Sequence, residues 1–191
     1  MLLGISGAEG TGPITRTGSH TNVPDQCVHC HMPDARHTFT VSLDISCAPC
    51  HTADDAASRE QTLQGTTLNG LLALRTRMRA WAQTTFGNPD LWNYPANLPV
   101  GTTAPAQSSI PIQIKRARHN YYYILLDRSY GVHNAFYTQY LLTYSNQNLD
   151  DLGVSAAVAH ATYAVPQLKS MVQSDIKTAM ASASQPDASG N

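Results

Sequence analysis

Cys27-Val28-His29-Cys30-His31 forms a C-x-x-C-H motif, and Cys47-Ala48-Pro49-Cys50-His51 repeats it further along the chain. Together the two motifs use all 4 cysteines of the protein. This spacing is the attachment signature of a c-type haem, because the two thiols can form thioethers with the haem and the following histidine can ligate the iron. The sequence therefore predicts two covalent haem c groups, attached through Cys27, Cys30, Cys47 and Cys50, with His31 and His51 as proximal iron ligands.

Two other interpretations of the cysteines stay open at this stage. Their spacing also reads as C-x2-C-x16-C-x2-C, which fits a four-cysteine zinc site in a structural module. A pair of redox-active dithiols or disulfides is the third interpretation. Neither alternative requires a histidine directly after each second cysteine, so the repeated histidine favours haem.

Length and charge limit the classes of protein. A chain of 191 residues predicts one domain with tails, and we expect an extended arm at 1–26, a single dihaem domain at 27–182 and a tail at 183–191. The formal net charge of −1 at pH 7 does not indicate nucleic acid or an anionic membrane surface as a partner. No apolar run approaches the length of a membrane span.

The haem motifs also carry an expectation about location. Haem c is attached outside the cytoplasm in bacteria and archaea, which predicts a periplasmic, extracellular or cell-surface protein. The start Met1-Leu2-Leu3-Gly4 is too short for a signal peptide and lacks basic residues. We therefore expect a processed form or a piece of a longer multihaem protein.

The remaining pattern predicts a mainly α protein with a loop-rich haem-binding N-terminal half, long C-terminal helices and little β structure. Periodic apolar residues predict a helix from Asp54 to about Thr85, and the charged Arg75, Arg77 and Arg79 on it suggest either a solvated face or partners for haem propionates. Further helices are expected from Ile110 or Pro111 to Asp127, from Ala135 to about Tyr144 after an Asn134 cap, and from Pro166 to about Ala181. A short strand is expected over His37–Leu43 and a long loop over Gly87–Ser109.

A third segment, Asp127-x-Ser129-x-Gly131-Val132-His133-Asn134, follows the two haem motifs. Together with Met32-Pro33 after the first motif, the three segments resemble the C-terminal part of multihaem cytochromes of the cytochrome c nitrite reductase and hydroxylamine oxidoreductase group. The resemblance covers about residues 20–145. It implies that His133 is the sixth ligand of the first haem and that His20 is the sixth ligand of the second haem.

The resemblance also implies limits. The catalytic haem of that group lies in a part that this chain lacks, so no catalytic residue is assigned and we do not expect the chain to be an enzyme by itself. In such cytochromes a histidine between the two motifs ligates a haem bound further upstream. The counterpart His37 is therefore idle, replaces an assigned ligand, or ligates a haem of another copy or protein.

The other histidines have weaker claims to an iron. His119 lies among tyrosines and is expected to pack or to bond a propionate, while His29 and His160 are not expected to be ligands. Met32 directly follows a proximal histidine and so points away from the open face of that iron.

Two bis-histidine irons predict an electron-transfer protein, since no substrate can reach a saturated metal. The expected partners are other redox proteins or further copies of this chain. Both ends of the chain are rich in small polar residues, and such ends are ordered only when they are bound to another part of the structure. Together with the unassigned His37, these ends favour a homo-oligomer or a polymeric haem chain. The alternative is an electron-transfer subunit or fragment of a multihaem reductase or oxidoreductase for small nitrogen or sulfur compounds, which would need an open iron.

Overall fold

The computed structural model describes residues 1–11, 14, 16–33, 37, 40–48, 50–155 and 164–183. This part of the chain is mainly helical and contains no strand, as predicted for a mainly α protein. Its helices are α1 (Cys27–His31), α2 (Ala53–Phe86), α3 (Ile112–Asp127), α4 (Ala135–Asp151) and α5 (Val165–Ala183). Single turns of tighter or wider helix are η1 (Ser19–Asn22), η3 (Leu43–Cys47), η4 (Pro95–Asn97) and η5 (Gln107–Ser109).

The strand expected over His37–Leu43 is wrong for the part of it that is described. Thr40, Val41 and Ser42 are irregular, and Leu43 opens the π-helical turn η3. A strand needs a neighbouring strand to complete its backbone hydrogen bonds. The described chain offers none, and the backbone bonds of η3 are local instead, with the Ser46 N–H donating to the Ser42 carbonyl at 2.7 Å.

The long helix α2 confirms the prediction to within one residue at each end. It begins where the Thr52 hydroxyl accepts a hydrogen bond from the Asp55 N–H, and Asp54 and Asp55 lie in its positively polarised first turn. It ends at Gly87, whose left-handed φ of 73° lets its N–H bond back to the Gln83 carbonyl.

Helix α4 is longer than expected. Its start is as predicted, because the Asn134 side chain accepts a hydrogen bond from the Tyr137 N–H. It continues beyond Tyr144 through a polar stretch with weak helix propensity. There the Asn148 side chain donates to the Tyr144 carbonyl at 2.7 Å, and the buried Arg77 of α2 binds the last turns. Tertiary contacts thus extend the helix where the local sequence alone would not.

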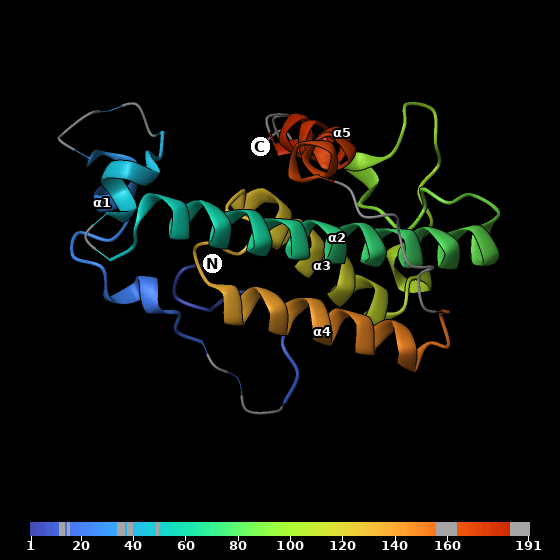
Figure 1. The fold of residues 1–191 in the computed structure, drawn as a ribbon. Helices are drawn as coiled ribbons and strands as arrows, with labels where there is room; N and C mark the ends of the chain where they lie inside the picture. The colour runs from blue at the N-terminus through green and yellow to red at the C-terminus, as the bar shows by residue number, and fades with distance from the viewer. Residues whose placement is uncertain are drawn as a thin grey trace, which may run out of the picture.

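Figure 1 shows how the helices are arranged. α2 runs through the middle, with α3 and α4 packed along it and α5 on the side of α2 away from α4. α3 runs antiparallel to α2, and α4 runs back again, so the start of α2, the end of α3 and the start of α4 lie at one end of the bundle. That end carries α1 and both C-x-x-C-H motifs. Over the residues described, no helix combines the length and the apolar character needed to cross a bilayer, which agrees with the prediction.

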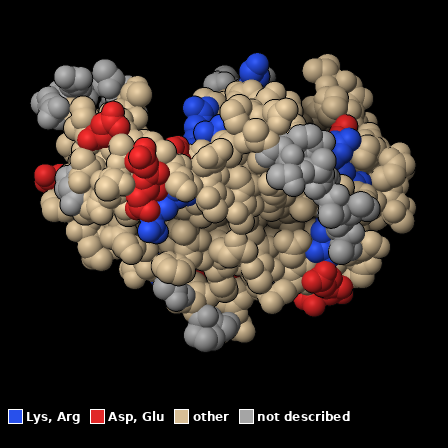
Figure 2. Space-filling model, in the orientation of Figure 1, with Lys and Arg blue, Asp and Glu red and all other residues tan. Residues whose placement is uncertain are grey.

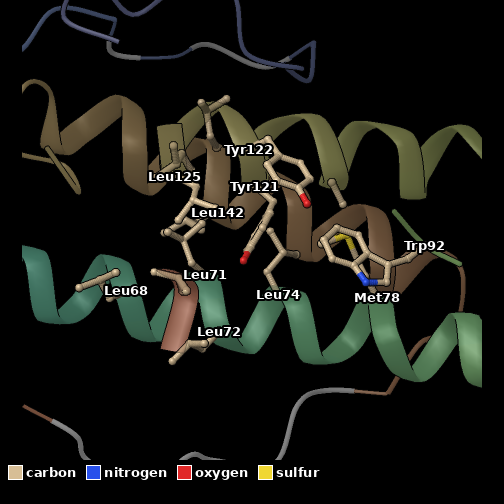
Figure 3. Close-up of a cluster of buried hydrophobic side chains, with 14 of the residues drawn as sticks. Leu68, Leu71, Leu72, Leu74, Met78, Trp92, Tyr121, Tyr122, Leu125 and Leu142 are labelled. Carbon is tan, nitrogen blue, oxygen red and sulfur yellow. The ribbon is translucent and has the colours of Figure 1, made fainter. Parts of the chain in front are cut away.

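The core lies between α2, α3 and α4 (Figure 3). Leu71, Leu74 and Met78 of α2 are fully buried against Tyr121 of α3, and Trp92 from the long loop closes the far end. Burial of each such side chain stabilises the fold by about 1.5–3 kcal/mol. This core holds the helices in register independently of the motif-bearing end.

The three arginines in the second half of α2 form ion pairs with other segments rather than a solvated face. Arg75 pairs with Asp175 of α5 at 3.0 Å, and Arg79 pairs with Asp90. Arg77 is only 4% exposed and pairs with Asp150 of α4 at 2.6 Å. Each guanidinium already has a carboxylate partner, so the propionate interpretation is not supported for these residues.

The N-terminal arm is held by polar side chains of α3 and α4. The buried Asn120 amide bonds both the N–H and the carbonyl of Ala8, at 2.7 and 2.9 Å. The N–H groups of Gly7 and Gly10 donate to the hydroxyls of Tyr137 and Tyr140, at 2.9 and 2.8 Å. The arm is thereby laid along the two helices and leads towards the motif-bearing end. The expected division at 26/27 stays a prediction, and the tail beyond Ala183 lies outside the described residues.

Candidate functional site

Each C-x-x-C-H motif forms one compact helical turn. The first motif is α1 itself, in which Cys27 is exposed and Cys30 is half-buried. In the second motif the N–H groups of Cys50 and His51 both donate to the Cys47 carbonyl, at 3.0 and 2.9 Å. A single turn places both thiols and the histidine of a motif close enough to act on one bound group.

The two motifs are joined to each other. The Ser46 hydroxyl, just before the second motif, donates to the carbonyl of Cys30 at 2.9 Å. η3 contacts both α1 and the start of α2. The two motif turns therefore lie beside one another at the end of the bundle, although 16 residues separate Cys30 from Cys47.

His31 and His133 are brought together from distant parts of the sequence. Their ring centroids lie 6.0 Å apart, with an interplanar angle of 69°. Two imidazoles that bind one metal ion from opposite sides have ring centres roughly 6 Å apart, because a metal–nitrogen bond is about 2 Å long and the nitrogen lies about 1 Å from the ring centre. The spacing of this pair therefore fits a shared iron.

The orientation of His133 is fixed by a carboxylate. Its Nδ1 lies 2.9 Å from Oδ1 of Asp127, and the Ser129 hydroxyl donates to Oδ2 of the same carboxylate at 2.5 Å. Burial tends to raise the pKa of Asp127, but the hydrogen bonds from His133 and Ser129 hold this pKa below its ordinary value. With Nδ1 engaged, Nε2 is the nitrogen of His133 that can ligate a metal.

The turn that carries His133 is pressed against α2. Arg128 and Tyr130 have positive φ angles of 59° and 50°, and Gly131 has one of 102°. A Cβ atom on Gly131 would lie 3.0 Å from the Thr67 hydroxyl and 3.2 Å from the Leu63 side chain. Only glycine fits this close approach without a shift, which explains why the turn ends in Gly131 directly before the ligand segment.

His51 has the same kind of support. Its Nδ1 lies 2.9 Å from Oδ2 of Asp55, one helical turn later. Nε of Arg59 donates to both oxygens of that carboxylate, at 2.8 Å each. Arg59 first and His51 second lower the pKa of Asp55. The sequence signal was the four-residue spacing between His51, just before the helix cap Thr52, and Asp55 in the first turn of α2. From the sequence, the acidic residues of this turn indicated only a helix start.

His20 lies at the same turn as His133 but not against His51. Its Nδ1 lies 2.7 Å from the carbonyl of Val132, the residue before His133, and its side chain is exposed. The described residues show no ring contact between His20 and His51 like the one between His31 and His133. The structure thus brings the first predicted ligand pair together and leaves the second pair as a prediction.

Of the other four histidines, the structure describes three. His37 is exposed in a turn between the motifs, and His29 is half-buried within α1. His119 uses Nε2 to bond the Ser6 carbonyl at 2.8 Å and stacks on Tyr123, which is the packing role expected for it. The prediction for His160 concerns a residue outside those described.

The zinc and dithiol interpretations gain no support from the cysteines. All four are free thiols, and no group of three or more potential metal ligands gathers within the described residues. Burial raises the pKa of the Cys30 thiol, and burial followed by Cys30 raises that of Cys47. A bound zinc ion would itself deprotonate coordinating thiols, so these pKa directions do not distinguish the three interpretations.

Comparison with known proteins gave no match: no family model fits the chain, and no curated protein or solved structure is significantly similar to it.

Proposed function

We propose that this protein is a dihaem c-type cytochrome that transfers electrons through two bis-histidine irons. The observation that carries the proposal is the 6.0 Å spacing of His31 and His133, which lie 102 positions apart in the chain. His31 belongs to a haem-attachment motif, and His133 is the residue expected opposite it. Haem c supplies one-electron exchange, and a second histidine in place of methionine favours a low reduction potential.

The first haem would be held by Cys27, Cys30 and His31, with His133 as the sixth ligand. The Asp127 carboxylate engages Nδ1 of His133 and leaves Nε2 to bind the iron of a bound haem, which would be the usual arrangement around a ligating imidazole. The half-buried His133 ring and the packed turn before it keep this ligand in one position, so little rearrangement is needed when the iron changes charge.

The second haem would be held by Cys47, Cys50 and His51, with His20 as the sixth ligand. Both histidines are bonded at Nδ1, to Asp55 and to the Val132 carbonyl, so Nε2 of each is available. The arm that carries His20 is anchored on α3 and α4, and this anchoring would hold the ligand near the motifs. Under this proposal His37 is a candidate ligand for a haem of a neighbouring copy.

The resemblance to the multihaem cytochrome group stays part of this proposal, as does an extracytoplasmic location. The partners would be other redox proteins or further copies of the chain. Figure 2 shows acidic side chains gathered at the end of the visible face that carries α1, while most of that face is uncharged. η3 and the first turn of α2 carry the exposed Asp44 and Asp54, and η3 contacts α1. This acidic end favours a partner with basic groups around its own redox centre.

The test is the haem content of the protein produced in a host with c-type haem attachment machinery. Intact mass and the pyridine haemochrome spectrum should show two covalent haems per chain. Cys30→Ala and Cys50→Ala should each disrupt attachment at their own motif, while a double substitution should leave no correctly attached haem. Two rings in edge-to-face contact can have a similar spacing without any metal between them, so the spacing has to be tested by haem content. Wild-type protein that matures without haem would contradict the proposal.

A second candidate is an electron-transfer subunit or fragment of a multihaem oxidoreductase. The observation that favours it is the lack of a ring contact between His20 and His51 in the described chain, since one open iron would admit a small ligand. Binding of nitrite or hydroxylamine to the reduced or oxidised wild-type protein, seen as a shift of the Soret band, would favour this candidate. Unchanged spectra would favour the electron carrier.

A further inference from the structure

The two carboxylates that orient the predicted ligands are not equivalent. Asp127 bonds His133, and Asp55 bonds His51, each at 2.9 Å. We propose that Asp127 polarises the haem pair, so that the His31–His133 haem has the lower reduction potential and electrons reside preferentially on the His51 haem. This inference rests on the proposed function and concerns which of the two irons holds the electron.

Asp127 presents a negative charge to its histidine that is only weakly compensated. Its side chain is only 14% exposed, and besides His133 its carboxylate accepts a hydrogen bond from the neutral Ser129 hydroxyl. The N-terminal ammonium of Met1 also lies near this carboxylate, but its effect is the smallest of those that lower the pKa of Asp127. A negative charge in a partly dry site interacts strongly with nearby charge. Through the Nδ1 hydrogen bond it makes the imidazole a more basic ligand and stabilises the more positive, oxidised iron. Its effect is therefore to lower the reduction potential.

Asp55 presents a weaker field to His51. Its side chain is 41% exposed, so water screens the charge. The Arg59 guanidinium also donates to both of its oxygens, at 2.8 Å each, and offsets the negative charge. On the other predicted ligand of this haem, His20, the partner is the neutral carbonyl of Val132. The hydrogen bonds at the second haem thus carry less net negative charge than the one at the first.

The two haems are also linked through one turn of backbone. Val132 orients His20, and the next residue, His133, is the ligand expected at the other iron. A difference in potential between two centres that share this turn sets the direction of electron flow within the pair. The His51 haem would be the one from which an external acceptor draws.

The experiment measures both reduction potentials by potentiometric titration of the holoprotein, followed by visible absorption and by low-spin EPR signals. The two signals are assigned with His133→Ala, which removes the low-spin signal of the first haem. Asp127→Asn keeps the size and an acceptor oxygen but removes the charge. It should shift the redox equilibrium of the first haem at least tenfold towards the reduced form. For one electron this corresponds to a reduction potential raised by about 59 mV.

Two matched variants make the result specific. Asp55→Asn should change the second haem's redox equilibrium less than threefold, because Arg59 and water already offset that charge. Ser129→Ala removes the donor that partly offsets Asp127 and should lower the first haem's potential, the opposite sign to Asp127→Asn. Damage to the site would not produce shifts of opposite sign from neighbouring residues.

The inference is overturned if Asp127→Asn leaves the first haem's equilibrium within threefold of wild type, or if Asp55→Asn shifts its own haem equally. It is also overturned if the first haem is the higher-potential centre in the wild type. A wild-type protein without haem would instead contradict the proposed function, so the two failures are distinguishable.

Discussion

At the scale of single residues, three of the predicted ligands share one local arrangement. His20, His51 and His133 each have Nδ1 within 2.9 Å of an oxygen that belongs to the chain. Such a bond fixes both the tautomer and the tilt of an imidazole and leaves Nε2 for a metal. His119 has the reverse arrangement, with Nε2 bonded to the Ser6 carbonyl. The pattern separates these three of the predicted ligands from a histidine that packs.

This separation predicts opposite results for two alanine variants. His133→Ala should convert one low-spin haem to a high-spin form that binds carbon monoxide, because the sixth ligand is lost. His119→Ala removes only a packing contact and a hydrogen bond and should leave both haems low-spin. Visible and EPR spectra of the purified holoproteins check this, and a fully low-spin His133→Ala protein would remove His133 from the ligand set.

At the scale of elements, α2 is the helix to which the others attach. Its buried Arg77 donates to Asp150 and to the carbonyls of Val154 and Ser155, at 2.6, 2.6 and 3.0 Å. These two carbonyls lie three and four residues past the end of α4 at Asp151, and Arg77 also donates to the Asn146 carbonyl within the helix at 3.3 Å. One side chain thus completes α4 and fastens it to α2.

Arg77→Met should lower the free energy of unfolding by about 2–4 kcal/mol, since several buried acceptors lose their donor. Arg77→Lys should recover only part of this loss, because one ammonium group cannot reach acceptors arranged for a planar fork. Denaturant unfolding followed by far-UV circular dichroism measures both. Equal stability of Arg77→Lys and wild type would show that charge alone matters at this position.

A charged contact within the arm, which also receives the Tyr137 hydroxyl of α4, depends on pH. Glu9 accepts hydrogen bonds from Arg16 at 2.8 and 2.5 Å and from the Tyr137 hydroxyl. Arg16 is the main cause that lowers the pKa of Glu9 below 4.5, although burial opposes it. A lowered pKa means that this carboxylate stabilises the fold above its ordinary pKa and that the contribution is lost as pH falls through the lowered value.

Wild-type stability should therefore fall relative to that of Glu9→Gln as pH is reduced below about 4.5. Arg16→Gln should weaken the same pH dependence, since it removes the main partner of Glu9. The measurement is the free energy of unfolding from pH 7 to pH 3 for the three proteins. Parallel curves for wild type and Glu9→Gln would contradict a role for this contact.

The sequence predicts these elements unevenly, for physical reasons. α2 carries its own start and stop signals, Thr52 and Gly87, so its ends could be predicted to within one residue. The last turns of α4 depend on Arg77, which lies some 70 positions away, and no local pattern reveals that. The arm has no periodicity because its contacts are hydrogen bonds from its backbone to side chains of α3 and α4.

The residues of the candidate site also differ in how far the sequence predicts them. The C-x-x-C-H motifs identify the cysteines and the proximal histidines directly. The approach of His133 to His31 depends on how the helices pack, and a family resemblance was what predicted this pair. The roles of Asp127 and Asp55 were missed, because a carboxylate near a histidine in sequence has many other uses.

At the scale of the whole molecule, the bundle has a packed end and a motif-bearing end. The buried core lies between α2, α3 and α4, whereas α1 lies at one end of these helices (Figures 1 and 3). His37 is exposed between the two motifs. This arrangement leaves the motif-bearing end accessible to a partner while the core maintains the fold.

If His37 ligates a haem of a neighbouring copy, His37→Ala should reduce the assembly to smaller species and create a high-spin haem. His29→Ala, a half-buried histidine in the same region, is the matched control and should change neither. Size-exclusion chromatography with light scattering and visible spectra test this together. Unchanged assembly and spectrum in His37→Ala would discard cross-subunit ligation.

The central claim is that both irons are saturated by histidine. The most direct measurement is the visible absorption spectrum of the reduced wild-type holoprotein before and after addition of carbon monoxide. Two bis-histidine irons predict sharp low-spin bands that carbon monoxide leaves unchanged. A shift of the Soret band on addition of carbon monoxide would reveal an exchangeable iron and contradict the account of a saturated electron carrier.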